Sequence, residues 1–179
     1  MKKAICMLLC MGCLLFGLTM PAFGAELGEP NITVQTTMRE LREHSSIKGS
    51  GYYTYCNEWS EKDTRWMDTT IESYVGAPEA QDVVSAMNLV IENYNKGVQV
   101  TWQVYSPEEI AENVQLGMVQ LYYFPADTSN ARFAIVVPGN GGPTTSELGE
   151  GGSMAWQLHE AGYAVFVLRY RSFMEATDN

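Results

Sequence analysis

One pattern in the second half of the sequence constrains the fold more than any other. A short apolar run, 133–137, leads into a glycine-rich stretch, and a second apolar run spans 163–168. Between them, 151–161 has apolar residues at three- and four-residue spacing and ends before Gly162, as a helix does. Strand, loop, helix and strand form a βαβ unit, whose right-handed crossover makes the two strands parallel. The sequence therefore predicts an α/β fold.

Both strands of this unit are predicted to be buried. Their runs are continuously apolar rather than alternating, which is typical of strands covered on both faces. If 163–168 were the last strand of the sheet, it would be an apolar exposed edge, which natural proteins avoid. We therefore expect a truncated sheet, the N-terminal part of a longer protein.

Upstream of this unit, the period of the apolar residues is that of strands. Alternation over Val98–Tyr105 predicts a half-buried strand, and Met118–Phe124 predicts another. A brief helix is expected to begin between them at Ser106, because a hydroxyl N-cap, proline at the first helical position and acids in the first turn follow one another.

The region before residue 96 is expected to be small and mainly helical. Residues 38–43 suggest a short helix, and Pro78–Tyr94 predicts a longer one that Lys96 and Gly97 close. Between these helices lies a cluster of aromatic residues. Its members are Tyr52, Tyr53, Tyr55, Trp59, Trp66 and Tyr74. Exposed rings of this kind stack on sugars, whereas buried rings pack in the core, which is the usual outcome in a small domain.

The first 24 residues have the organisation of a signal peptide. Lys2 and Lys3 precede an apolar run, 4–18, and Ala22-Phe23-Gly24 offers small residues for cleavage, so the mature chain is expected to begin near Ala25. The run is too short for a comfortable membrane span, which takes about 20 apolar residues. We expect a secreted, extracytoplasmic protein without a membrane anchor after cleavage.

The cysteines bear on two questions: whether the chain carries a lipid anchor, and whether it has disulfides or a zinc site. Cys10 and Cys13 make a lipoprotein anchor the rival interpretation, but neither has the flanking residues that such an anchor requires. Outside the signal peptide only Cys56 remains, so neither a disulfide framework nor a cysteine zinc site can form. No metal is expected.

The charge of the chain limits its partners. The formal net charge is −10, and loss of Lys2 and Lys3 with the signal peptide would lower it by two, to about −12. Such a surface repels nucleic acid and anionic lipid, so neither is an expected partner. A neutral small-molecule substrate is the better match.

The glycine-rich stretch, Pro138–Thr145, lies where open α/β sheets bind ligands, beyond the carboxyl end of a strand. A dinucleotide phosphate is one candidate, and Arg169 and Arg171 after the next strand favour it. However, the stretch lacks the third glycine of the dinucleotide motif and has no P-loop sequence, and an exported protein has little access to such cofactors. We expect no cofactor.

An oxyanion hole is the second candidate for this stretch. Acyl transfer needs backbone N–H groups aimed at a developing negative oxygen, and glycines after a buried strand allow that approach. Asn140 and Gly141 are the predicted donors. A plain glycine turn between strand and helix is the third interpretation.

Three stretches together resemble a known family. They are PGNGG at 138–142, Glu150-Gly151, and AGYAVFVLRYR at 161–171. In this order they resemble the first βαβ unit of secreted α/β-hydrolases of the acetyl-xylan esterase and feruloyl esterase-like group. The two upstream strands are similar to the antiparallel hairpin that opens that fold. The resemblance covers residues 96–179 and implies a partial α/β-hydrolase domain there. With the signal peptide at 1–24, this leaves 25–95 as an N-terminal extension of unassigned role.

The resemblance implies a serine esterase that acts on acylated carbohydrate or small esters. Family members attack the ester with a serine on a nucleophile elbow, followed in chain order by an acid and a histidine. No such elbow occurs before Asn179, so this chain alone is expected to be inactive. Asn140 also stands where the family usually has glycine.

Three residues that imitate triad members are expected to be structural. Ser153 lies in a relaxed G-x-S-x-A context, but no buried strand runs into it, so it is expected to sit at a helix start. His44 and His159 do not follow a serine and an acid in the required order. The alternative function is a non-catalytic exported module that binds polysaccharide through the aromatic cluster.

Overall fold

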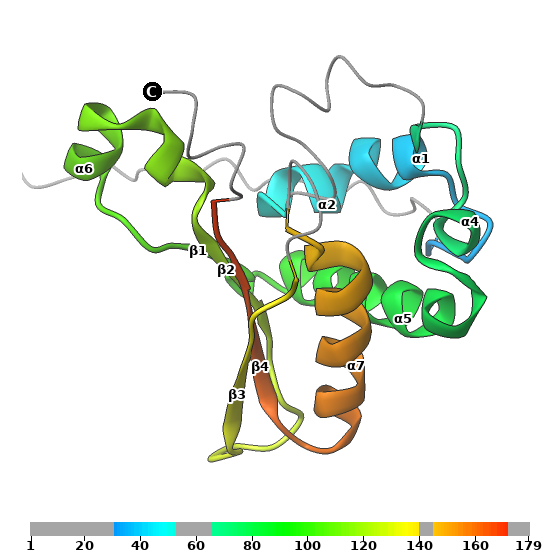
Figure 1. Cartoon of the computed structure of the whole chain (residues 1–179). Coiled ribbons are helices and arrows are strands. Elements are labelled where there is room, and N and C mark those ends of the chain that lie inside the picture. Colours follow the sequence, from blue (N-terminus) through cyan, green and yellow to red (C-terminus); the bar gives the residue numbers. More distant parts are fainter. Residues whose placement is uncertain (1–30, 53–65, 140–144, 172–179) are drawn as a thin grey trace, which may run out of the picture.

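The computed structural model describes residues 31–52, 66–139 and 145–171, which form a four-stranded mixed sheet with helices (Figure 1). Its strands are β1 (Thr101–Gln103), β2 (Gln120–Phe124), β3 (Phe133–Val136) and β4 (Ala164–Arg169). The spatial order is β1-β2-β4-β3, with β2 antiparallel to both neighbours and β3 parallel to β4. The predicted α/β class, with an antiparallel pair followed by a parallel βαβ unit, is confirmed.

The helices follow the sequence signals closely. They are α1 (Met38–Glu43), α2 (Ser45–Ser50), α4 (Ile71–Val75), α5 (Ala77–Asn95), α6 (Pro107–Glu112) and α7 (Gly152–Glu160), with a 3₁₀ turn at Val114–Met118 and a π turn at Glu147–Gly151. Ser106 caps α6 through a capping box, and Gly97 and Gly162 follow α5 and α7 with positive φ. These three predictions are confirmed.

The predicted strands are shorter than expected in the first half of the sheet. The strand expected at 98–105 is limited to the three residues of β1, and β2 begins at Gln120 because the preceding residues form the 3₁₀ turn.

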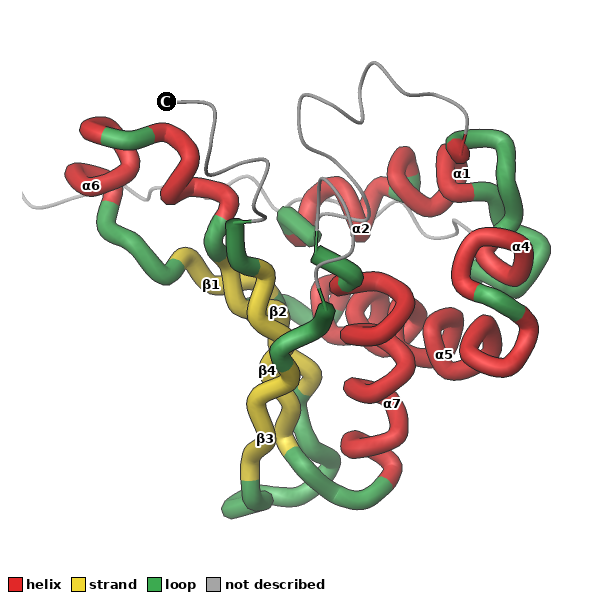
Figure 2. The backbone as a smooth tube through the Cα atoms, in the orientation of Figure 1, coloured by secondary structure: helices red, strands yellow, loops and turns green. Residues whose placement is uncertain are grey.

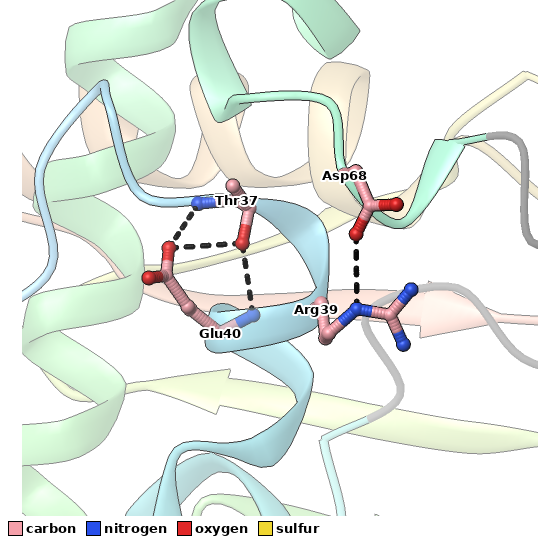
Figure 3. A network of polar contacts seen from close by, with 4 residues as sticks. All are labelled: Thr37, Arg39, Glu40 and Asp68. Atoms are coloured by element: carbon pink, nitrogen blue, oxygen red, sulfur yellow. Dashed lines mark hydrogen bonds and ion pairs between the residues drawn. The ribbon is translucent and has the colours of Figure 1, made fainter.

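Local polar contacts define the start of the helical region (Figure 3). The Thr37 hydroxyl accepts the backbone N–H of Glu40 at 3.2 Å, and the Glu40 carboxylate accepts the backbone N–H of Thr37 at 2.8 Å. These hydrogen bonds hold the pKa of Glu40 below its usual value, the bond from the Thr37 backbone contributing most. Beside them, Arg39 Nε donates to Asp68 at 3.0 Å. The pair is exposed, so it orients the segment before α4 more than it stabilises the fold.

One face of the sheet carries the core. Helices α5 and α7 pack against each other and lie on the same side of the strands (Figures 1 and 2). Inward-facing side chains from the two central strands meet them. The fully buried ones are Tyr122, Phe124, Val165 and Val167, which join one cluster with Met38, Leu41, Ile71 and the buried face of α5. The helical segment before residue 96 and the sheet therefore share a single hydrophobic core.

The opposite face of the sheet, which we call the outer face, is apolar and open. By the strand register its residues lie side by side: Trp102, Leu121 and Leu168 in one row, and Tyr123, Phe166 and Ile135 in the next. Tyr123 and Phe166 stack with ring centroids 4.8 Å apart, and the Ile135 side chain is 58% exposed. Among the described helices, none covers this face of β3 and β4 (Figure 1).

Two expectations about burial are therefore wrong. The run 133–137 is not covered on both faces, because Phe133, Ile135 and Val137 are exposed while the residues between them point inward. The run 163–168 is not covered on both faces either, because burial alternates along β4. It is also not an edge strand, because β4 lies between β2 and β3, so the condition from which a truncated sheet was inferred is not met. The edge strand is β3, and within the described residues no strand pairs with its free side.

Because the outer face is open, we expect a small truncation on the inner face to destabilise the fold more than a larger truncation on the outer face. Val167→Ala removes fewer atoms than Ile135→Ala, yet it should cost about 2 kcal/mol of unfolding free energy because it leaves a cavity under α7. Ile135→Ala should cost less than about 0.5 kcal/mol because its side chain is already in water. Urea unfolding measures both. A larger loss for Ile135→Ala would mean that the outer face is covered in solution.

Candidate functional site at the end of the parallel strands

The base of the glycine-rich loop is fixed by hydrogen bonds on both sides. The Glu150 carboxylate accepts the backbone N–H of Gly139 at 2.7 Å, and the Ser146 N–H donates to the Gly139 carbonyl at 2.9 Å. The Tyr170 hydroxyl donates to the Pro138 carbonyl at 2.8 Å. These hydrogen bonds hold together the two ends of the loop, where it leaves β3 and where it enters the π turn. We call this point the loop neck.

The predicted oxyanion donors, Asn140 and Gly141, lie outside the described residues. What is described is the residue before them. The N–H of Gly139 is engaged by Glu150, so it is not available to a ligand while that bond is made. Any backbone donor that this loop offers must come from the residues after Gly139.

A buried ion pair anchors the segment that follows the loop. Arg169 at the end of β4 is 1% exposed and Glu147 in the π turn is 2% exposed, with Arg169 Nε 3.8 Å from Glu147 Oε1. The Arg169 guanidinium also donates to the carbonyl of Met118, and the Thr145 hydroxyl donates to the Glu147 carboxylate at 2.7 Å. Because Arg169 is enclosed in this network, it does not face a nucleotide 2′-phosphate.

Tyr52 connects the helical region to the same network. Its ring stacks on Tyr122 with centroids 4.0 Å apart, and its hydroxyl donates to the Glu147 carbonyl at 3.4 Å. Burial raises the pKa of the Tyr52 hydroxyl well above its usual value, and the negative charge of Glu147 raises it further. The phenol is therefore held in its neutral form.

The aromatic cluster of the sequence divides into separate groups. Tyr52 lies in the core, as the packing interpretation predicts. Trp66 and Tyr74 form an edge-to-face pair, 6.1 Å between centroids, in which Trp66 is 45% exposed. Tyr53, Tyr55 and Trp59 lie outside the described residues. Stacking on a ligand therefore stays a prediction for Trp66.

A pocket of about 500 Å³ lies beside the neck of the loop. Its lining consists of Trp66, Tyr74 and Val75, the segment 145–150, and Glu79 from the first turn of α5. The sequence shows acids after the glycine stretch, at Glu147 and Glu150. Nothing in the sequence shows that α4 and the start of α5 lie against that segment, so the pocket was not predicted.

The residues that imitate a catalytic triad are all buried. Ser153 is buried in α7, where its hydroxyl donates to Asp82 of α5 at 3.3 Å, and Gln157 donates to the same carboxylate at 2.8 Å. His159 is buried against Trp156, with Nε2 4.0 Å from Asp127. His44 is buried at the start of α2. The expectation that Ser153 belongs to the start of a helix is confirmed.

No group of three or more His, Cys, Asp or Glu side chains in the described ranges is arranged to hold a metal ion. The described helices include none long and apolar enough to cross a membrane. The signal peptide expected at 1–24 lies outside the described residues.

Comparison with known proteins found no matching family model, no matching curated protein and no matching solved structure.

The packing beneath the loop neck predicts a contrast between two glycines of the π turn. A Cβ at Gly151 would lie 2.8 Å from Cγ1 of buried Val167, so Gly151→Ala should cost about 1–3 kcal/mol of unfolding free energy. At Gly149 the nearest atom would be 3.5 Å away, so Gly149→Ala should change stability by less than about 1 kcal/mol. Urea unfolding of both variants measures the contrast, and equal effects would contradict the described packing of the π turn on β4.

The raised pKa of Tyr52 predicts a loss of stability in alkali. The unfolded chain releases this proton near pH 10, whereas the folded protein retains it, so the stabilisation is present below about pH 10 and is lost as the pH rises toward the folded-state pKa. Tyr52→Phe should therefore show a shallower fall in unfolding free energy above pH 10 than the unchanged chain. Identical slopes would show that the Tyr52 hydroxyl is not buried.

Proposed function

We propose that this chain is the N-terminal part of a secreted carboxylic ester hydrolase of the α/β-hydrolase type, acting on acylated carbohydrate or small esters. The observation that carries the proposal is the glycine-rich loop between β3 and α7 in a parallel βαβ unit. In α/β-hydrolases, the loop after the third strand supplies one N–H of the oxyanion hole. The closed neck at Gly139 supports this role, because catalysis requires donors held in place before the reaction.

The open surfaces of the sheet support the same proposal. The free side of β3 is where a further parallel strand would pair, and the apolar outer face is where its helices would pack. In the hydrolase fold, the nucleophile elbow lies at the end of such a strand. Pairing at β3 would bring that elbow beside the loop after Gly139.

In the complete hydrolase, the serine would attack the ester carbonyl, and a histidine supported by an acid would move the proton. The backbone N–H groups of Asn140 and Gly141 would stabilise the oxyanion, so residues 25–179 contribute charge stabilisation rather than proton transfer. No metal or cofactor is required for this chemistry. The signal-peptide pattern at 1–24 supports export of the enzyme from the cytoplasm, and a surface of strong negative charge suits an uncharged substrate.

Removing one of the donors should lower catalysis without removing the fold. In the longer hydrolase, Gly141→Pro deletes a backbone N–H, and kcat for p-nitrophenyl acetate should fall by about 10²–10³ with a smaller change in KM. Gly141→Ala retains the N–H and is the matched control, which should keep most of the activity. Steady-state kinetics of the two variants measures the difference.

Ser153 provides the second control. The 179-residue chain alone should not hydrolyse p-nitrophenyl acetate, because Ser153 is committed to Asp82 and has no histidine among its hydrogen-bond partners. Hydrolysis by this chain that disappears in Ser153→Ala would refute the proposal, since the nucleophile would then lie in α7.

A further inference from the structure

The pocket beside the loop neck has one aromatic wall that the core does not explain. Trp66 is 45% exposed and meets Tyr74 edge to face, with an interplanar angle of 73°. The rings therefore form a fixed corner of which the indole is open to solvent. A flat, half-exposed indole in a concave site is the surface on which the apolar face of a sugar ring stacks.

The other residues that line the pocket include polar and negatively charged side chains. Glu79 and Glu150 are exposed at the pocket, and Ser146 adds a hydroxyl. Among the described residues that line it, none is Lys, Arg or His. Carboxylates accept hydrogen bonds from sugar hydroxyls, but they repel a ligand carboxylate or phosphate, and the net charge of the chain adds to this repulsion.

The state of the carboxylates favours a polyhydroxylated ligand over a cation. Glu147 is paired with Arg169 and accepts from Thr145, and one oxygen of Glu150 accepts the Gly139 N–H. The charge of Glu147 is thus balanced inside the protein, whereas Glu79 and Glu150 are exposed. The pocket combines hydrogen-bond acceptors with an aromatic ring, in a volume suited to a small ligand.

We propose that this pocket binds an uncharged sugar ring stacked on Trp66 and discriminates against sugars that carry a carboxylate. The assignment gives the helical segment before residue 96 a role, because that segment supplies Trp66, Tyr74 and Glu79. Identifying the sugar as the alcohol part of an ester rests on the proposed function. Binding itself does not, because the pocket is made without any nucleophile.

The test uses the chain itself with three defined probes: xylotetraose as the neutral sugar, trigalacturonate as the acidic sugar and tetramethylammonium as the cation. Isothermal titration calorimetry, supported by ligand-observed NMR for weak binding, gives the dissociation constants. Xylotetraose should bind, and trigalacturonate should bind at least about tenfold more weakly because of the facing carboxylates.

Two pairs of variants locate the site. Trp66→Ala should weaken xylotetraose binding at least about tenfold, whereas Trp102→Ala, which removes an indole of the same 45% exposure from the outer face, should leave it within about twofold. Glu79→Gln should reduce the ratio of the trigalacturonate to the xylotetraose dissociation constant at least about threefold. Glu92 is an exposed glutamate on the same helix, and Glu92→Gln should leave this ratio unchanged. Circular dichroism and urea midpoints check that each variant is folded.

The proposal is overturned if the chain does not bind xylotetraose, if the two tryptophan variants lose affinity equally, or if trigalacturonate binds as well as the neutral sugar. Tighter binding of tetramethylammonium in competition with xylotetraose would also overturn it. Absence of ester hydrolysis alongside Trp66-dependent sugar binding would refute the proposed hydrolase and leave the sugar site standing.

Discussion

The buried pair of Glu147 and Arg169 is the interaction on which the geometry of the site depends. Four parts of the chain meet there: the end of β4, the π turn after the loop, the carbonyl of Met118 before β2, and Tyr52 from the helical region. Breaking such a pair by removing one partner typically costs about 3–5 kcal/mol, because the other charge stays buried. The polar network therefore holds the returning end of the loop in a single position relative to the sheet.

This arrangement also answers an electrostatic problem. If the loop holds an oxyanion, as we propose, uncompensated negative charge should not surround it, yet Glu147 and Glu150 both follow it closely in sequence. Glu147 is balanced by Arg169, and Glu150 accepts the N–H of Gly139 at the loop neck. Glu147 thus serves as a partner of Arg169 and Glu150 as an acceptor at the loop neck, while Glu79 and Glu150 are the exposed acids that line the pocket.

The elements could be predicted wherever the signal was local. The capping box at Ser106, the glycines after α5 and α7, and the helical spacing in 151–161 each depend on neighbours within one turn. Whether one face or both faces of a strand are buried could not be predicted, because an apolar run looks the same in the two cases. In β3, the Ile135 side chain is exposed. The insertion of β4 between β2 and β3 depends on long-range pairing. The same holds for the pocket, since Trp66 and Glu150 are distant in sequence and meet only through packing.

The claim that the loop after β3 is one half of a hydrolase site is tested most directly by the nucleotide sequence of the gene beyond the codon for Asn179. We expect it to encode an apolar strand followed by G-x-S-x-G, and then an acid and a histidine in that order. A verified stop codon directly after Asn179, with no such motif in any downstream frame, would contradict the claim.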